Sequence, residues 1–301
     1  MHDRPQGRFV ALSIMATLAI ALTGCAERGN PSVPVAPVTS EQPNPADQPS
    51  TGAPPVASPA ASTVEPSAAP ASDNPAKVVE GEAYHPTIVP TDFTTEITNP
   101  YMPLEPGTAL TYKGAGEMNV FNVTERTREV MGVTTVVVRD RAFENGQLVE
   151  DTEDWFAQDS AGNVWYFGEA TAECNGNRIV SRHGAWEAGV DGAQPGIVML
   201  ANPDVGDYYR QEYLRGEAED VARVVKLDAT IENPLGTYPN VVITEDFTKL
   251  EPAIVEHKKY APGVGLVEEQ IVKGGSGIVE LTKVHPSAGA GPSTAGDLCQ
   301  G

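Results

Sequence analysis

The chain has few of the residues that usually build metal or redox sites. Among 301 residues there are only 3 cysteines and 5 histidines, with no Cys-x-x-Cys pair and no Cys/His cluster. Structural zinc sites and thioredoxin-like dithiols need such groupings. P-loop, dinucleotide-binding and serine-hydrolase elbow motifs are also missing after the expected strands. The sequence therefore predicts no metal and no cofactor, and it gives no support to nucleotide chemistry.

Basic residues are scarce as well. The chain has 20 Lys and Arg against 41 Asp and Glu, which gives a formal net charge of -21 at pH 7. Nucleic acid is bound by basic surfaces, so it is not a predicted partner. An acidic surface favours solubility and attracts cationic partners.

Long apolar runs are missing apart from one near the N-terminus. Arg4 and Arg8 precede an apolar run over residues 9–22, which is shorter than the roughly 20 residues of a membrane-spanning helix. A basic start, a short apolar run and small residues after it are typical of a secretory signal peptide. A short transmembrane anchor and a plain cleaved signal with an incidental cysteine are the two alternatives.

The run ends in Leu22-Thr23-Gly24-Cys25, which resembles the lipobox of bacterial lipoproteins. The resemblance implies a lipoprotein signal peptide over residues 1–24 and lipid, such as palmitate, on the sulfur and amine of Cys25. It also implies an extracytoplasmic protein of the cell envelope or periplasm that is lipid-anchored to a bacterial membrane. Several buried acyl chains anchor a protein firmly, at about 0.8 kcal/mol per buried methylene.

Composition divides the rest of the chain into three parts. Residues 25–86 are rich in Pro, Ala and Ser, and 14 of the 26 prolines lie between residues 31 and 90. Such a segment cannot bury a core, so we expect a disordered linker. Residues 87–286 are long enough for one domain with a sizeable core, and residues 287–301 are expected to form a flexible tail.

Two cysteines remain once Cys25 is assigned to the lipobox. Cys174 and Cys299 form an even pair in a compartment that permits disulfides. A disulfide between them would tie the C-terminal tail to the domain, and two free thiols are the alternative. Sequence alone does not supply the geometry that a disulfide needs.

The pattern of residues 87–286 is that of a mainly β protein. Val- and Thr-rich segments alternate with turn signals, among them Asn145-Gly146 and the segment 159–163. We predict about ten antiparallel strands in a curved sheet, a half-barrel or a sandwich. The expected strands cover residues 108–113, 119–124, 133–143, 147–158, 164–167, 207–213, 222–231, 241–247, 254–260, 266–272 and 277–284. A short helix around residues 218–221 competes with a strand there, and residues 186–203 are expected to form an irregular loop.

The densest acidic run is Glu150-Asp151-Thr152-Glu153-Asp154. In a strand, Glu150, Thr152 and Asp154 share one face, while Asp151 and Glu153 lie on the other. Two carboxylates on one face favour cation binding or acid/base work, whereas a solvated edge strand protected from aggregation is the simpler interpretation. The segment 159–163 offers oxygens for calcium, but a hairpin turn explains the same residues.

Aromatic and polar side chains together suggest a pocket. Trp165 and Tyr166 lie in an expected strand, and Trp186, Glu187 and Asp191 lie in the expected irregular loop. Functional residues often lie on such loops, and a few polar groups among aromatics are typical of ligand pockets. These five residues are our candidate ligand pocket.

Several blocks resemble a family of bacterial extracytoplasmic lipoproteins for which we know of no activity. The blocks are residues 153–159, 162–169, 186–196 and 260–265. The turn Tyr-Ala-Pro-Gly-Val-Gly at residues 260–265 also looks like elements of LolA-like lipoproteins, whose curved antiparallel sheet wraps around an apolar ligand cavity. The first resemblance implies no activity, and the second favours a binding module for a lipid-like or envelope ligand. A carboxylate-based hydrolase of envelope or extracellular polymer and a structural surface protein are the alternatives.

Overall fold

The structure, a computed structural model, describes residues 74–78, 83–114, 116–286 and 298–299. All of these residues belong to one compact unit. The predicted signal peptide, Cys25 and most of the predicted linker lie outside the described residues. Among the described residues, no helix has the length and apolar character needed to cross a membrane.

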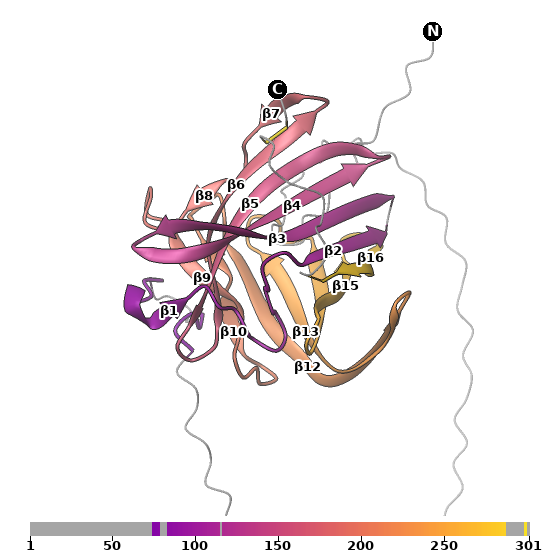
Figure 1. The fold of residues 1–301 in the computed structure, drawn as a ribbon. Coiled ribbons are helices and arrows are strands. Elements are labelled where there is room, and N and C mark those ends of the chain that lie inside the picture. Colours follow the sequence, from indigo (N-terminus) through magenta and orange to yellow (C-terminus); the bar gives the residue numbers. More distant parts are fainter. Residues whose placement is uncertain (1–73, 79–82, 115, 287–297, 300–301) are drawn as a thin grey trace, which may run out of the picture. The chain divides into compact units, whose positions relative to one another are not determined.

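One curved antiparallel sheet makes up the described unit (Figure 1). A single 3-10 turn, η1 (Pro90–Asp92), precedes it. The strands are β1 (Phe93–Thr94), β2 (Ala109–Gly114), β3 (Glu117–Val130), β4 (Val133–Glu144), β5 (Gln147–Asp159), β6 (Val164–Asn175), β7 (Arg178–Ser181), β8 (Trp186–Glu187), β9 (Gln194–Met199), β10 (Tyr208–Arg210), β11 (Glu212–Tyr213), β12 (Asp220–Asn233), β13 (Gly236–Thr248), β14 (Val255–Ala261), β15 (Gly265–Lys273) and β16 (Gly277–His285).

The sheet nearly closes on itself. Its order runs β10-β12-β13-β14-β15-β16-β2-β3-β4-β5-β6-β9-β11, so its first and last strands are consecutive in the chain. Only Gln211 separates β10 from β11, and its backbone N–H donates to the Asp220 carbonyl oxygen at 2.9 Å. Because one short segment pairs with both β12 and β9, the two ends of the sheet are held together.

The predicted mainly β fold is confirmed, with more and longer strands than expected. Of the two alternatives for residues 218–221, the strand is confirmed and the helix is wrong: β12 begins at Asp220, which pairs with Thr248 of β13. The predicted irregular loop over residues 186–203 instead contains β8 and β9. At Gly196 a side chain would meet the Gln211 carbonyl oxygen at 2.3 Å, so glycine permits the close approach that joins β9 to the closing segment.

The start of the unit also contacts the sheet. Residues 74–78 and Tyr84 fall within the predicted linker, yet Ala76 is fully buried. The Arg210 N–H donates to the Ala76 carbonyl oxygen at 2.9 Å, and the Tyr84 hydroxyl donates to the Pro195 carbonyl oxygen at 2.7 Å. The ordered unit therefore begins before residue 87.

Candidate functional site inside the curved sheet

The acidic run lies on a central strand. Strand β5 pairs with β4 on one side and β6 on the other, so the interpretation as a solvated edge strand is wrong. Glu150, Thr152 and Asp154 are buried on the face that the sheet encloses. Asp151 is buried on the opposite, outer face. Neighbouring strands pair with the edges of a strand, while its faces are buried by what packs above and below the sheet, and composition alone reveals neither.

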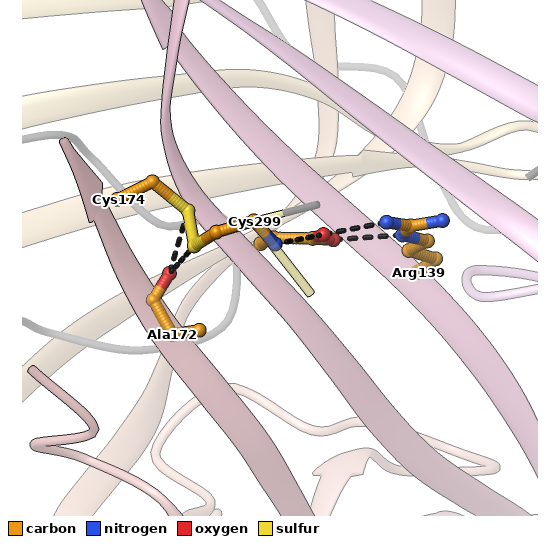
Figure 2. Close-up of a disulfide and its surroundings, with 5 residues drawn as sticks. Arg139, Ala172, Cys174 and Cys299 are labelled. Atoms are coloured by element: carbon orange, nitrogen blue, oxygen red, sulfur yellow. Dashed lines mark hydrogen bonds and ion pairs between the residues drawn. A yellow bond between two sulfur atoms is a disulfide. The ribbon is translucent and has the colours of Figure 1, made fainter. Parts of the chain in front are cut away.

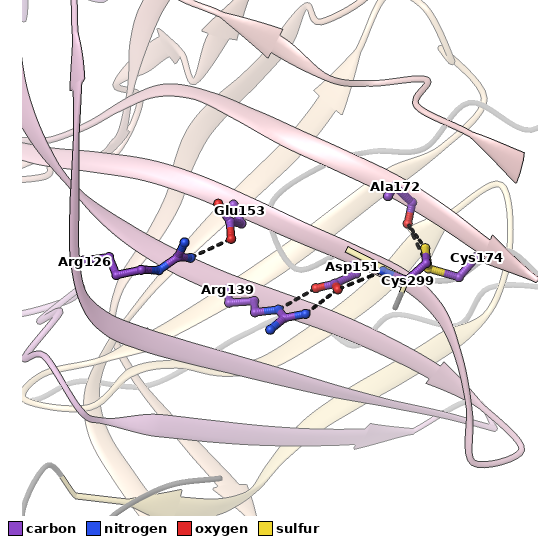
Figure 3. Close-up of polar contacts among 7 residues, drawn as sticks. All are labelled: Arg126, Arg139, Asp151, Glu153, Ala172, Cys174 and Cys299. Carbon is purple, nitrogen blue, oxygen red and sulfur yellow. Dashed lines mark hydrogen bonds and ion pairs between the residues drawn. A yellow bond between two sulfur atoms is a disulfide. The ribbon is translucent and has the colours of Figure 1, made fainter. Parts of the chain in front are cut away.

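The outer face of β5 is covered by the Arg139–Asp151 ion pair and by Cys299. Arg139 Nε donates to Asp151 Oδ1 at 2.7 Å, and its Nη2 donates to Oδ2. The backbone N–H of Cys299 donates to the same carboxylate at 3.4 Å. Cys299 is joined by a disulfide to Cys174 at the end of β6, and both sulfur atoms lie beside the Ala172 carbonyl oxygen (Figure 2). Figure 3 shows the more exposed Arg126–Glu153 pair, which joins β3 to β5, near the Arg139–Asp151 pair, which joins β4 to β5.

On the inner face, Tyr166 and three side chains around it form the first part of a buried polar cluster. The Tyr166 hydroxyl donates to Asp154 Oδ1 at 2.7 Å. Glu169 lies directly opposite Asp154 in the register of β5 and β6. Trp186 packs edge-on against Tyr166, with ring centroids 5.3 Å apart. Burial raises the pKa of Asp154 well above its usual range, and the neighbouring Glu169 raises it further.

A bulge in β6 places Tyr166 and Glu169 on the same face. Gly168 has φ +128°, and the register shifts between Asp154 and Phe156 at this point. An ideal strand would direct residues 166 and 169 to opposite faces. Both side chains reach the enclosed face because the bulge adds one residue to β6.

The second part of the cluster surrounds Lys258. Its ammonium lies 3.4 Å from Asp246 Oδ2, and Gln211 Nε2 donates to the same oxygen at 3.1 Å. Glu256 and Glu269 lie on β14 and β15 beside Lys258. Burial alone would lower the pKa of Lys258, but Asp246 and Glu269 raise it above its usual value, so the side chain is cationic.

The two parts form one cluster across the enclosed space. Glu212 of β11 acts electrostatically on Glu169 and Tyr166 and is itself stabilised by Lys258 of β14. Burial raises the pKa of Glu169, Glu212 and Glu269 well above the usual range for glutamate, and raises that of Glu256 as well. We call Asp154, Glu169, Glu212, Asp246, Glu256, Glu269 and Lys258 the inner carboxyl cluster.

Two hydroxyl groups beside the cluster have unused hydrogen-bonding capacity. Tyr209 is fully buried and interacts electrostatically with Asp246 and Lys258. Thr244 lies opposite Lys258 in the pairing of β13 with β14. Neither hydroxyl has a hydrogen-bond partner among the described residues. Buried hydroxyls are normally satisfied, so this region can accept further polar contacts.

An apolar pocket lies at one end of the enclosed face. It is a shallow depression: about 300 Å³ of empty space lies over it, open solvent included, of which about 20 Å³ admits the centres of water-sized molecules. Its wall is formed by Met102, Pro103, Leu104, Leu110, Tyr112, Phe121, Tyr260, Val264, Gly265 and Leu266. The Tyr112 hydroxyl on β2 donates to the Leu266 carbonyl oxygen on β15 at 3.0 Å. The turn at residues 260–265, singled out by sequence, thus forms one side of this pocket.

The five residues of the sequence-derived pocket are only partly brought together. Tyr166 and Trp186 contact each other at the inner carboxyl cluster. Trp165 lies on the opposite face of β6, where its ring meets Phe93 at 5.9 Å. Glu187 pairs with Arg128 at a partly exposed position, and Asp191 is exposed in a turn.

Sequence reasoning missed most of the cluster. On β13 the buried residues Thr244, Asp246 and Thr248 alternate with the more exposed Glu245 and Phe247, which inverts the usual pattern of apolar inside and polar outside. On β14 polar residues occur on both faces. Hydrophobic periodicity therefore could not indicate which face was buried, although a strand with polar residues at every second position is a signal for a polar interior.

The segment 159–163 is a hairpin turn between β5 and β6. The Asp159 carboxylate accepts hydrogen bonds from the backbone N–H groups of Ala161 and Asn163 and from the Trp165 indole. The hydrogen-bonding capacity of this carboxylate is therefore used by the turn itself.

In the part of the chain that the structure describes, no group of three or more His, Cys, Asp or Glu residues could hold a metal ion.

Comparisons with known proteins give structural similarity only. No family model and no curated protein matches the sequence. One similar crystal structure is that of a candidate exported protein with a YmcC-like fold from Bacteroides fragilis, with 15% identity, a TM-score of 0.38, and coverage of 62% of this chain and 99% of that one. Another is a candidate lipoprotein from Parabacteroides distasonis, with 11% identity, a TM-score of 0.34, and coverage of 62% and 98%. Similarity at this level identifies neither a family nor an activity.

Proposed function

We propose that this protein is a lipid-anchored binding module of the bacterial cell envelope. In this proposal Cys25 carries the anchor, residues 25 to about 73 form the tether, and the apolar pocket holds the chain of a lipid-like molecule. The observation that carries the proposal is the pocket itself, because an apolar concave wall at the mouth of an enclosed face is typical of small-molecule sites. The lipobox supports the extracytoplasmic location.

The pocket is built on rigid elements. Leu110 and Phe121 are opposite each other in the pairing of β2 with β3, and Tyr260 and Leu266 are opposite each other in β14 and β15. The segment that carries Met102 is held by the Gly263 N–H, which donates to the Pro100 carbonyl oxygen at 2.7 Å. A preformed wall lowers the ordering cost of binding.

Occupancy of the pocket can be tested by filling it. We expect lipid to co-purify with the wild-type protein and to be identified by mass spectrometry of an organic extract. Val264→Trp places a large side chain at the pocket wall and should remove most of that lipid. Val272→Trp is the matched control, because Val272 is an exposed valine on β15 and should leave the lipid in place. Equal lipid content in the two variants would contradict the proposal.

The carboxylate-based hydrolase is less well supported. Asp154 and Glu169 are opposite each other on neighbouring strands, which is a spacing compatible with acid/base pairs. However, their exposed fractions are only 1% and 3%. An extended polymer needs an open cleft along both carboxyl groups, and side chains buried to this degree do not line one.

A further inference from the structure

We propose that the apolar pocket and the part of the inner carboxyl cluster around Lys258 form one amphipathic site, which takes a single-chain amphiphile with a cationic amine head group. This inference rests on the proposed function and adds the chemical class of the ligand. The chain would lie against the pocket wall, and the amine would face the carboxyl groups.

The register of the strands places the two regions next to each other. Tyr260 lines the pocket, and Lys258 is the next residue of β14 on the same face, about 7 Å further along the strand. Phe121 lines the pocket as well, and Asp140 lies directly opposite it in the pairing of β3 with β4. The acidic region therefore begins one side chain beyond the apolar wall.

Carboxyl groups are the main ionisable groups behind the pocket. Tyr112 and Tyr260 form its inner wall, and the carboxyl groups that act on these two tyrosines are Asp140, Asp246, Glu256 and Glu269. Lys258 is a cation that acts on Tyr260. Burial raises the pKa of Glu256 and Glu269. An ammonium group placed beside these carboxyl groups would favour their ionised form and pair with it, whereas a carboxylate or phosphate head group would not. The net charge of -21 adds a long-range attraction for cations.

The hydroxyl groups of Tyr209 and Thr244 support a polar ligand end in this region. Both residues are at least nine-tenths buried, and both lie against the Asp246–Lys258 pair without a hydrogen-bond partner of their own among the described residues. An amine donates up to three hydrogen bonds, so hydroxyl and carboxyl oxygens are suitable acceptors for it.

The proposal can be tested with three probes of equal chain length. Octylammonium, octanol and octanoate are titrated calorimetrically into the full chain carrying Cys25→Ala, which cannot be acylated at that position. We expect octylammonium to bind at least about tenfold more tightly than octanol, and octanoate to bind most weakly. In Glu269→Gln the preference for the amine should fall to about threefold or less while octanol binding is retained. Glu232→Gln, at an exposed position of β12, is the charge-matched control and should keep the full preference.

The outcomes separate the two proposals. Octanol binding equal to or tighter than octylammonium binding would overturn the head-group inference and leave the binding function standing. An unchanged preference in Glu269→Gln, repeated in Asp140→Asn, would also overturn it. Failure of all three probes to bind would count against the proposed function itself.

Discussion

At the scale of single residues, Arg139 and Asp151 form a charged pair inside the fold. The Asp151 side chain is fully buried, and the exposed fraction of Arg139 is 5%. Two hydrogen bonds join the guanidinium to the carboxylate, and the Cys299 N–H adds a third to the same group. A buried pair of this kind gives little net stability compared with apolar residues, but the loss of one partner is costly.

We therefore predict that Asp151→Ala lowers the free energy of unfolding by about 3–5 kcal/mol, because Arg139 is left charged and buried. The double variant Arg139→Met/Asp151→Leu should lose much less, since no buried charge remains. Urea unfolding followed by tryptophan fluorescence measures both. A double variant as unstable as the single one would show that the loss of the Asp151 carboxylate beside Arg139 is not the cause.

At the scale of elements, the bulge in β6 depends on one glycine. A side chain at Gly168 would lie 2.4 Å from the Trp186 carbonyl oxygen and 3.0 Å from Glu187 Cα. These contacts are with the backbone of β8, which cannot move aside without breaking its pairing with β6. The bulge that turns Glu169 inward therefore requires glycine at this position.

Gly168→Ala should destabilise the protein by about 2–4 kcal/mol, because it combines an unfavourable φ with overpacking. Gly146→Ala, at φ +79° with open space around it, isolates the cost of the backbone angle, which is about 1–2 kcal/mol. Thermal unfolding by circular dichroism compares the two variants. Equal losses in both would mean that the contact with β8 does not matter.

The elements differ in how far the sequence predicted them. The hairpin at Asn145-Gly146 was predicted because Asn-Gly favours a two-residue turn and the flanking segments are rich in β-branched residues. The pairing of β4 with β5 confirms it. Strand β9 was missed because Pro195 and Gly196 signal a loop, and only its pairing with β6 and β11 makes it a strand. The apolar pocket was missed because residues 102–104, 110–112 and 260–266 meet only when the sheet curves.

At the scale of the whole unit, the enclosed carboxyl groups tie stability to pH. The folded-state pKa values of Asp154, Glu169, Glu212, Glu256 and Glu269 are raised, first by burial and then mainly by neighbouring acidic groups. Lys258, with its own raised pKa, counters part of this effect at Glu212, Glu256 and Glu269. The folded protein thus holds protons that the unfolded chain releases near pH 4.

The sign of the pH effect follows from this difference. Stability from these groups is fully present below about pH 4 and is lost as the pH rises through their folded-state pKa values. We predict a lower urea midpoint at pH 8 than at pH 5, with about 1.4 kcal/mol lost for each unit that the pH rises between the two pKa values of one group. Glu169→Gln should reduce the slope, because glutamine has no proton to lose. A midpoint that rises between pH 5 and pH 8 would contradict this prediction.

The disulfide described above also has a mechanical consequence. It joins residues 125 positions apart in the chain, so the segment from β7 to β16 lies within a covalent loop. A pulling force applied between residue 74 and residue 299 could extend only the chain up to Cys174, which is about 340 Å at full extension. Strands β7 to β16 would carry no tension along their own backbone, and the pocket wall formed by residues 260–266 would be shielded from the load.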